Sequence, residues 1–146
     1  MELAVAQGAD LNATREQSEA SARTILIVDD NVSSAQTLAM LLELAGHVAH
    51  VAHAGDAGIE TFERHRPEVV LLDIGLPGLD GYEVARRIRR SEGGREAVLI
   101  AATGYGRDED RRKAVEAGFD HHLVKPIDLE ALQRLLADPV RLRTDP

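Results

Sequence analysis

The sequence predicts an α/β fold: a three-layer sandwich built on one parallel five-stranded sheet. Short apolar runs, mostly of β-branched residues, recur along the chain, and such runs are typical of strands buried on both faces. Between them, apolar residues recur three and four positions apart, as on one face of a helix. Five strands alternating with five helices favour parallel strands joined by right-handed helical crossovers.

The first strand is predicted at Ile25–Val28, which is apolar throughout. An apolar stripe at helical spacing follows it, made of Leu38, Leu41, Leu42 and Ala45. Gly46 then suits the left-handed residue that ends many helices. The stretch 47–53 is a weaker strand candidate, because valines at 48 and 51 are its main apolar members.

A second helix is predicted at 57–65, opened by Asp56 and closed before Pro67, since aspartate caps helix starts and proline blocks continuation. Residues 69–72 form another fully apolar strand. The third helix begins at Asp80, with Glu83 three residues on as in a capping box.

That helix runs to about Arg90, before a pair of glycines, and the apolar run 97–101 is the fourth strand. A charged helix at 108–117 ends at Gly118, and 121–124 is a short fifth strand. Asp128 then caps a last helix whose inner side carries Leu129, Leu132, Leu135 and Leu136.

Composition limits the classes of function. The chain has 146 residues, enough for one core. A net charge of -8 argues against non-specific nucleic-acid binding. The absence of cysteine excludes disulfides, thiolate metal sites and a cysteine nucleophile. No run approaches the about 18 apolar residues of a membrane helix, so a cytoplasmic protein is expected. We expect a linker or disordered extension at 1–22, one domain at 23–138, and a tail at 139–146.

Polar residues end the apolar strands abruptly. Asp29 and Asp30 follow the first strand, Asp73 the third, Thr103 the fourth and Lys125 the fifth. Ligands of open α/β sheets bind outside the carboxyl ends of the strands. We therefore expect three carboxylates, one hydroxyl and one ammonium to converge on one edge.

Such a cluster has a chemical use. Carboxylates packed together repel one another, and a divalent cation relieves that repulsion. Mg²⁺ prefers octahedral oxygen coordination, so two or three carboxylates with a backbone carbonyl suit it. A carboxylate beside Mg²⁺ and an ammonium is a suitable nucleophile for a phosphoryl group, because phosphoryl transfer depends mainly on positioning and charge stabilisation.

Four segments, ILIVDDN, VVLLDIGLPGLDGYEVA, LIAATGYG and HHLVKPID, resemble the response-regulator receiver domain of two-component signalling in residue type, order and spacing. The resemblance covers about Thr24 to Leu136. It implies a flavodoxin-like (βα)5 sandwich with strand order 2-1-3-4-5. It also implies that Asp73 is the phosphoacceptor, and that a histidine kinase or histidine phosphotransfer protein is the donor.

The resemblance assigns further roles. Asp30, Asp73 and the Gly75 carbonyl would bind Mg²⁺ directly, and Asp29 would orient a metal-bound water. Thr103 would be the hydroxyl that moves onto the phosphoryl group.

Lys125 would bind the phosphate, with a cis bond before Pro126. A switch residue, often Tyr or Phe in the family, is here His122.

Phosphorylation would switch a docking surface for an unknown downstream protein. The chain resembles both stand-alone receivers and those of hybrid histidine kinases, in which 1–22 would be the linker from the kinase core.

Other readings are weaker. A haloacid-dehalogenase-like phosphatase needs a second aspartate where Gly75 stands. A flavodoxin-like electron carrier needs a phosphate-cradling loop after the first strand, where Asp29-Asp30-Asn31 would repel phosphate. A degenerate receiver acting only as an interaction module remains an alternative.

Some of these residues also have purely structural interpretations. The aspartates at 29 and 30 could merely cap the first helix. The six histidines are interpreted as solvated or surface residues, with His50 and His53 on opposite faces of one strand. The arginines at 86–90 are interpreted as a solvated helix face.

Overall fold

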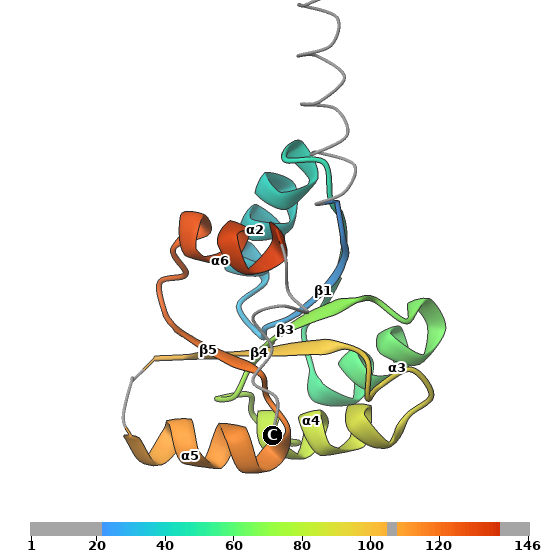
Figure 1. Ribbon diagram of the computed structural model, residues 1–146, viewed down its shortest axis with the longest axis vertical. Helices are drawn as coiled ribbons and strands as arrows, with labels where there is room; N and C mark the ends of the chain where they lie inside the picture. Colours follow the sequence, from blue (N-terminus) through green and yellow to red (C-terminus); the bar gives the residue numbers. More distant parts are fainter. Residues whose placement is uncertain (1–21, 105–107, 138–146) are drawn as a thin grey trace, which may run out of the picture.

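The computed structural model describes residues 22–104 and 108–137 (Figure 1). The strands are β1 (Thr24–Val28), β2 (Val48–Ala52), β3 (Val69–Asp73), β4 (Val98–Thr103) and β5 (His121–Val124). The helices in these ranges are α2 (Val32–Leu44), α3 (Gly55–His65), α4 (Gly81–Arg90), α5 (Asp108–Ala117) and α6 (Leu129–Ala137). The predicted extension 1–22, apart from Ala22, and the tail 139–146 lie outside the described residues.

The five strands form one parallel sheet in the order β2-β1-β3-β4-β5. This confirms the predicted flavodoxin-like order. The three inner strands are almost wholly buried, whereas the edge strands β2 and β5 are mostly half-exposed. Burial on both faces explains why the inner strands read as continuous apolar runs.

Two helical layers cover the sheet. Figure 1 shows α2 and α6 on one face and α3, α4 and α5 on the other. The second layer packs through Phe62, Val84, Ala85, Ile88, Ala114 and Ala117, and the first through Ala35, Ala39, Leu42, Leu132 and Leu136. Within the described ranges, no helix has both the length and the apolar character needed to span a bilayer.

The predicted apolar stripe of α2 is partly wrong. Leu42 is fully buried and Leu38 packs at the edge of the core, but Leu41 is 39% exposed. The buried face is instead completed by Ala35 and Ala39, whose small side chains let the helix lie close to the sheet. Gly46 has the expected positive φ, at 101°.

The start of α3 also differs from the prediction. Its N-cap is Ala54, whose side chain makes no capping bond, and Asp56 lies within the first turn. Only glycine fits at the first helical position: a Cβ there would lie 2.7 Å from Val84 Cγ2 and 2.8 Å from the Leu79 carbonyl oxygen. This helix start therefore packs closely against α4 and has no side-chain cap at its N-cap residue.

The fourth strand is longer than predicted. It extends through Thr103, which pairs with Val124 of β5. Strand β2 is shorter, so that His47 and His53 flank it. The predicted helix cap at Asp80 is confirmed, because its Oδ1 accepts a 2.9 Å hydrogen bond from the Glu83 backbone N–H.

Candidate functional site

Three carboxylates meet at the carboxyl edge of the sheet. Asp29, Asp30 and Asp73 each offer an oxygen within 4.8 Å of the others. Asp29 and Asp73 are 8% and 9% exposed, whereas Asp30 is exposed. The predicted convergence of carboxylates from the ends of two different strands is therefore confirmed.

Local backbone geometry holds Asp29. Its N–H donates to the Ala52 carbonyl oxygen at 3.0 Å, and its Oδ1 accepts a 2.9 Å bond from the Asn31 N–H. Asn31 is the N-cap of α2, since its Oδ1 accepts from the Ser34 N–H at 3.0 Å. The reading of the two aspartates as mere helix caps is thus wrong for this helix.

The loop after β3 holds Asp73. The Gly75 N–H donates to Asp73 Oδ1 at 2.8 Å. Gly81 lets α4 begin directly against this loop, because a Cβ there would lie 2.4 Å from Ile74 Cα and 2.7 Å from the Asp73 carbonyl oxygen. Two glycines therefore shape the surroundings of the central carboxylate.

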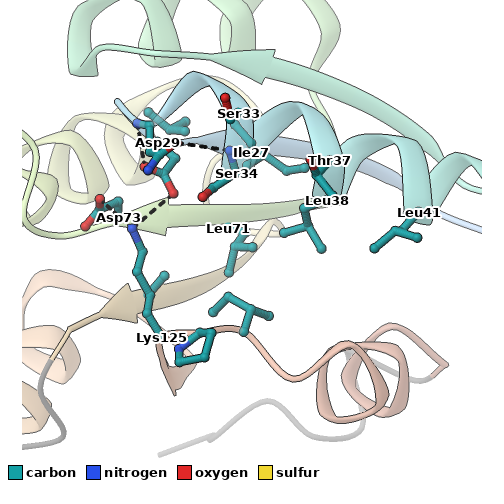
Figure 2. A pocket seen from close by; sticks show the side chains of 16 residues that line it. Ile27, Asp29, Ser33, Ser34, Thr37, Leu38, Leu41, Leu71, Asp73 and Lys125 are labelled. Carbon is teal, nitrogen blue, oxygen red and sulfur yellow. Dashed lines mark hydrogen bonds and ion pairs between the residues drawn. The ribbon is translucent and has the colours of Figure 1, made fainter.

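Lys125 bridges two of the carboxylates. Its Nζ donates to Asp73 Oδ2 at 2.9 Å and to Asp29 Oδ2 at 3.0 Å (Figure 2). Burial alone would lower the pKa of this ammonium, but the hydrogen bonds to the two carboxylates outweigh burial and raise it. Lys125 N–H also donates to the Thr103 carbonyl oxygen at 2.7 Å, and the Lys125–Pro126 bond is cis, as predicted.

The charges of the site do not balance. Three carboxylates and one ammonium sum to a formal charge of -3 + 1 = -2. One divalent cation cancels that charge, and Mg²⁺ accepts an oxygen-only ligand set of this kind. The donor chemistry therefore fits Mg²⁺ held by Asp29, Asp30 and Asp73.

Thr103 ends β4 with 3% of its surface exposed. His122 pairs in register with Ala101, two residues before Thr103. The His122 side chain lines a cavity of about 300 Å³ between β5 and α5, together with Arg111. Burial and the Arg111 charge lower the pKa of His122, and its Nε2 is buried with no hydrogen-bond partner among the described residues.

A groove of about 670 Å³ adjoins the acidic edge. Figure 2 shows it between α2 and the segment after β5, with Asp73 and Lys125 at one end and Leu41 at the other. Its floor is apolar, from Ile27 and Leu71 of the sheet, and hydroxyls of α2 line one wall.

Three contacts were not predicted from the sequence. His53 Nδ1 lies 3.0 Å from the Asp29 carbonyl oxygen, so it is not a solvated residue. His47 is 9% exposed, and its Nδ1 accepts the Arg23 N–H at 2.9 Å. The Arg89 side chain does not lie on the solvated arginine face, and its Nη2 pairs with Asp120 Oδ2 at 2.8 Å. These contacts involve backbone groups or distant residues, so no local sequence pattern could have indicated them.

The chain belongs to the family described as "Response regulator receiver domain", whose profile matches residues 25–137. It is 36% identical over 112 residues to an uncharacterised 14.6 kDa protein of Leptolyngbya boryana, covering 77% of this chain and 86% of that protein. It is also 33% identical to the phosphate regulon transcriptional regulatory protein PhoB of Pseudomonas aeruginosa. That protein is longer, and the match spans 54% of its length.

Solved structures agree with the family. The receiver domain of sensor histidine kinase PA1611 of Pseudomonas aeruginosa, described with a magnesium ion in its active-site cleft, superposes with a TM-score of 0.72. It is 34% identical, and the match covers 79% of this chain and 94% of that one. The receiver domain of Ssk1 from Saccharomyces cerevisiae, solved with the histidine phosphotransfer protein Ypd1, matches with a TM-score of 0.73 at 26% identity, over 79% and 86% of the two chains. The chain is therefore a receiver domain of the two-component type.

Proposed function

We propose that the chain accepts a phosphoryl group on Asp73 from a histidine kinase or a histidine phosphotransfer protein, with Mg²⁺ as cofactor. The observation that carries this proposal is the buried Asp73 carboxylate, placed beside two further carboxylates and bonded to Lys125 Nζ at 2.9 Å. A receiver domain of Ssk1 is seen with its phosphotransfer protein, which supports a donor of the same class.

Mg²⁺ would be held directly by Asp30, Asp73 and the Gly75 carbonyl, with Asp29 at the same site orienting a metal-bound water, and would neutralise negative charge on the transferring group. An oxygen of Asp73 attacks phosphorus as the bond to the donor imidazole nitrogen breaks, and the electron pair of that bond stays on the imidazole. The reaction is the chain's own modification and its reversal, so the chain is no enzyme toward other substrates.

Lys125 would bind the phosphoryl group in this mechanism. Its ammonium is already hydrogen-bonded to Asp73 Oδ2, so it is placed to donate to an oxygen of the incoming phosphoryl group. Preorganised donors of this type stabilise charge that develops in the transition state. The raised pKa of Lys125 keeps the donor charged.

Phosphorylation would change the surface that a partner protein binds. Thr103 would turn its hydroxyl toward the phosphoryl oxygens. His122 lies on the neighbouring strand β5, opposite Ala101, and its side chain would change position between β5 and α5. A downstream protein would bind the altered face. Because a kinase supplies the phosphoryl group, we place this reaction in the cytoplasm, in a stand-alone regulator or a hybrid kinase.

The test is intact-mass spectrometry after incubation with phosphoramidate and Mg²⁺. The wild-type chain gains the mass of one phosphoryl group, and this gain disappears when EDTA removes the metal. Asp73→Asn, which keeps the shape and removes the nucleophile, gains nothing. A wild-type chain that folds but takes up no phosphoryl group contradicts the proposal and favours the phosphorylation-independent interaction module.

A further inference from the structure

His53 makes a contact that the phosphorylation chemistry does not use. It directly follows β2, and its Nδ1 lies 3.0 Å from the Asp29 carbonyl oxygen. A carbonyl oxygen only accepts hydrogen bonds, so Nδ1 is the donor. Nδ1 carries a hydrogen in one neutral tautomer and in the imidazolium form, so the contact does not require His53 to be charged.

The ring extends the pairing between β1 and β2. The last paired residues of these strands are Val28 and Ala52. One step further, the Asp29 N–H still donates to the Ala52 carbonyl oxygen at 3.0 Å. The imidazole of His53 then binds the carbonyl of the same residue, so both backbone polar groups of Asp29 are held from β2 and the residue that follows it.

Holding this carbonyl orients the next residue. The Asp29 carbonyl and the Asp30 nitrogen share one planar peptide unit, which resists twisting. Fixing the plane therefore limits the directions in which the Asp30 side chain leaves the backbone. This matters because Asp30 is exposed, yet its carboxylate oxygen must stay within 4.8 Å of those of Asp29 and Asp73 to share a cation.

We propose that His53 is a positioning residue for the metal site: its ring fixes the peptide between Asp29 and Asp30 and so directs the Asp30 carboxylate toward the cation. The inference rests on the proposed function, since it gives His53 a task only if a divalent cation binds. Groups that orient metal ligands commonly affect affinity strongly although they do not touch the metal.

The variants His53→Ala, His53→Asn and His65→Ala test this assignment. Asparagine keeps an N–H donor close to the position of Nδ1, whereas alanine removes it. His65→Ala is the matched control, because this exposed ring stacks on His50 at a centroid distance of 3.9 Å. Binding of Mn²⁺ is followed by electron paramagnetic resonance with Mg²⁺ competition, and urea unfolding is measured without metal.

We expect His53→Ala to weaken cation binding about tenfold or more, in the range found for partners of metal ligands. His53→Asn restores most of the affinity, and His65→Ala binds as the wild type does. Restored cation affinity in His53→Asn separates positioning from general support of the fold. We expect it even if His53→Ala and His53→Asn unfold at the same urea concentration, because equal stability cannot explain a difference in affinity.

Wild-type affinity in His53→Ala overturns this inference and leaves the proposed function intact. Equal losses of affinity in His53→Ala and His53→Asn also overturn it, since the hydrogen bond would then be irrelevant. A wild-type chain that binds neither Mn²⁺ nor Mg²⁺ overturns both the inference and the metal-dependent function.

Discussion

Two parts of the molecule place a basic side chain against a largely buried carboxylate, and they differ in charge balance. At the carboxyl edge of the sheet, Lys125 faces Asp29 and Asp73, with Asp30 beside them. Near the amino end of β4, Arg89 of α4 faces Asp120 at 2.8 Å. The first cluster has a formal charge of -2 and the second is neutral.

The Arg89 cluster is saturated with hydrogen bonds. The guanidinium donates to the carbonyl oxygens of Gly118, Gly94 and Ala97 at 2.6 to 2.9 Å, besides Asp120. Asp120 Oδ2 in turn accepts the Leu99 N–H at 2.9 Å. These contacts tie α4 to the segment that leads into β4 and to the segment before β5, so this pair serves the fold.

The difference shows how one kind of contact serves two purposes. A balanced pair whose donors and acceptors meet backbone groups fixes structure. An unbalanced cluster at a strand edge retains negative charge that a bound cation can neutralise, so it is suited to binding. The two clusters should therefore respond differently to substitution and to Mg²⁺.

The largest effect is expected from Lys125→Met. We expect the rate of phosphorylation by phosphoramidate to fall a hundred- to a thousand-fold, roughly the effect of removing one preorganised donor. Stopped-time intact-mass measurements at saturating Mg²⁺ give the rate. Lys113→Met is the control for loss of a lysine away from the site, and it should react at the wild-type rate. A Lys125→Met rate within a few-fold of wild type would remove the lysine from the mechanism.

Arg89→Met should affect stability instead. Removing one partner of a largely buried ion pair leaves the other charge uncompensated, so we expect the free energy of unfolding to fall by up to about 3 kcal/mol. Urea unfolding measures it, with Arg86→Met on the exposed face of the same helix as control. Added Mg²⁺ should not restore the loss. A loss below that of Arg86→Met would show that the saturated cluster does not support the fold.

Mg²⁺ should stabilise the wild-type chain. A ligand that binds only the folded state at ten times its Kd adds about 1.4 kcal/mol. Asp30→Asn should lose most of this gain, because one of the three carboxylates no longer carries charge, while its stability without metal stays close to wild type. Thermal unfolding with and without Mg²⁺ checks both statements. Equal stabilisation of the two proteins would place the cation elsewhere.

The smallest effect is a pH dependence at the amino end of the sheet. Burial and the charge of Arg23 lower the pKa of His47 below its usual 6.5, although Glu68 opposes the shift. The unfolded chain then binds more protons, so the stability that neutral His47 provides is present above pH 6.5 and is lost as the pH falls below it.

Urea unfolding between about pH 7.5 and pH 5.5 measures this loss, a window centred on the unperturbed histidine value. His47→Gln should show a shallower decline, because it has no ring to protonate. Other histidines with lowered pKa, such as His121, add to the wild-type slope, so only the difference between the two proteins reports on His47. Identical slopes would contradict the assignment.

The sequence was sufficient for a parallel sheet and for its acidic edge, for a physical reason. Inner strands buried on both faces must be apolar, so the aspartates at 29 and 73 and the threonine at 103 are conspicuous where the strands end. Parallel topology then brings these ends together. The family resemblance supplied the strand order and the cis bond before Pro126, both confirmed in the structure.

What could not be predicted involves contacts that leave no pattern. His53 binds a backbone carbonyl 24 residues away and Arg89 binds Asp120 31 residues away. Any residue type can supply a carbonyl, so the acceptors have no signature. The start of α3 was misplaced because its N-cap, Ala54, makes no side-chain capping bond and the expected cap, Asp56, lies inside the first turn.

In the proposed mechanism, phosphate becomes covalently bound to a single carboxylate, that of Asp73. Borohydride reduces an aspartyl phosphate to homoserine, and peptide sequencing by mass spectrometry then locates the modified position. After treatment with phosphoramidate and Mg²⁺, homoserine is expected at position 73 alone. Homoserine at position 29 or 30, or none in a protein that has gained the phosphoryl mass, would contradict the account.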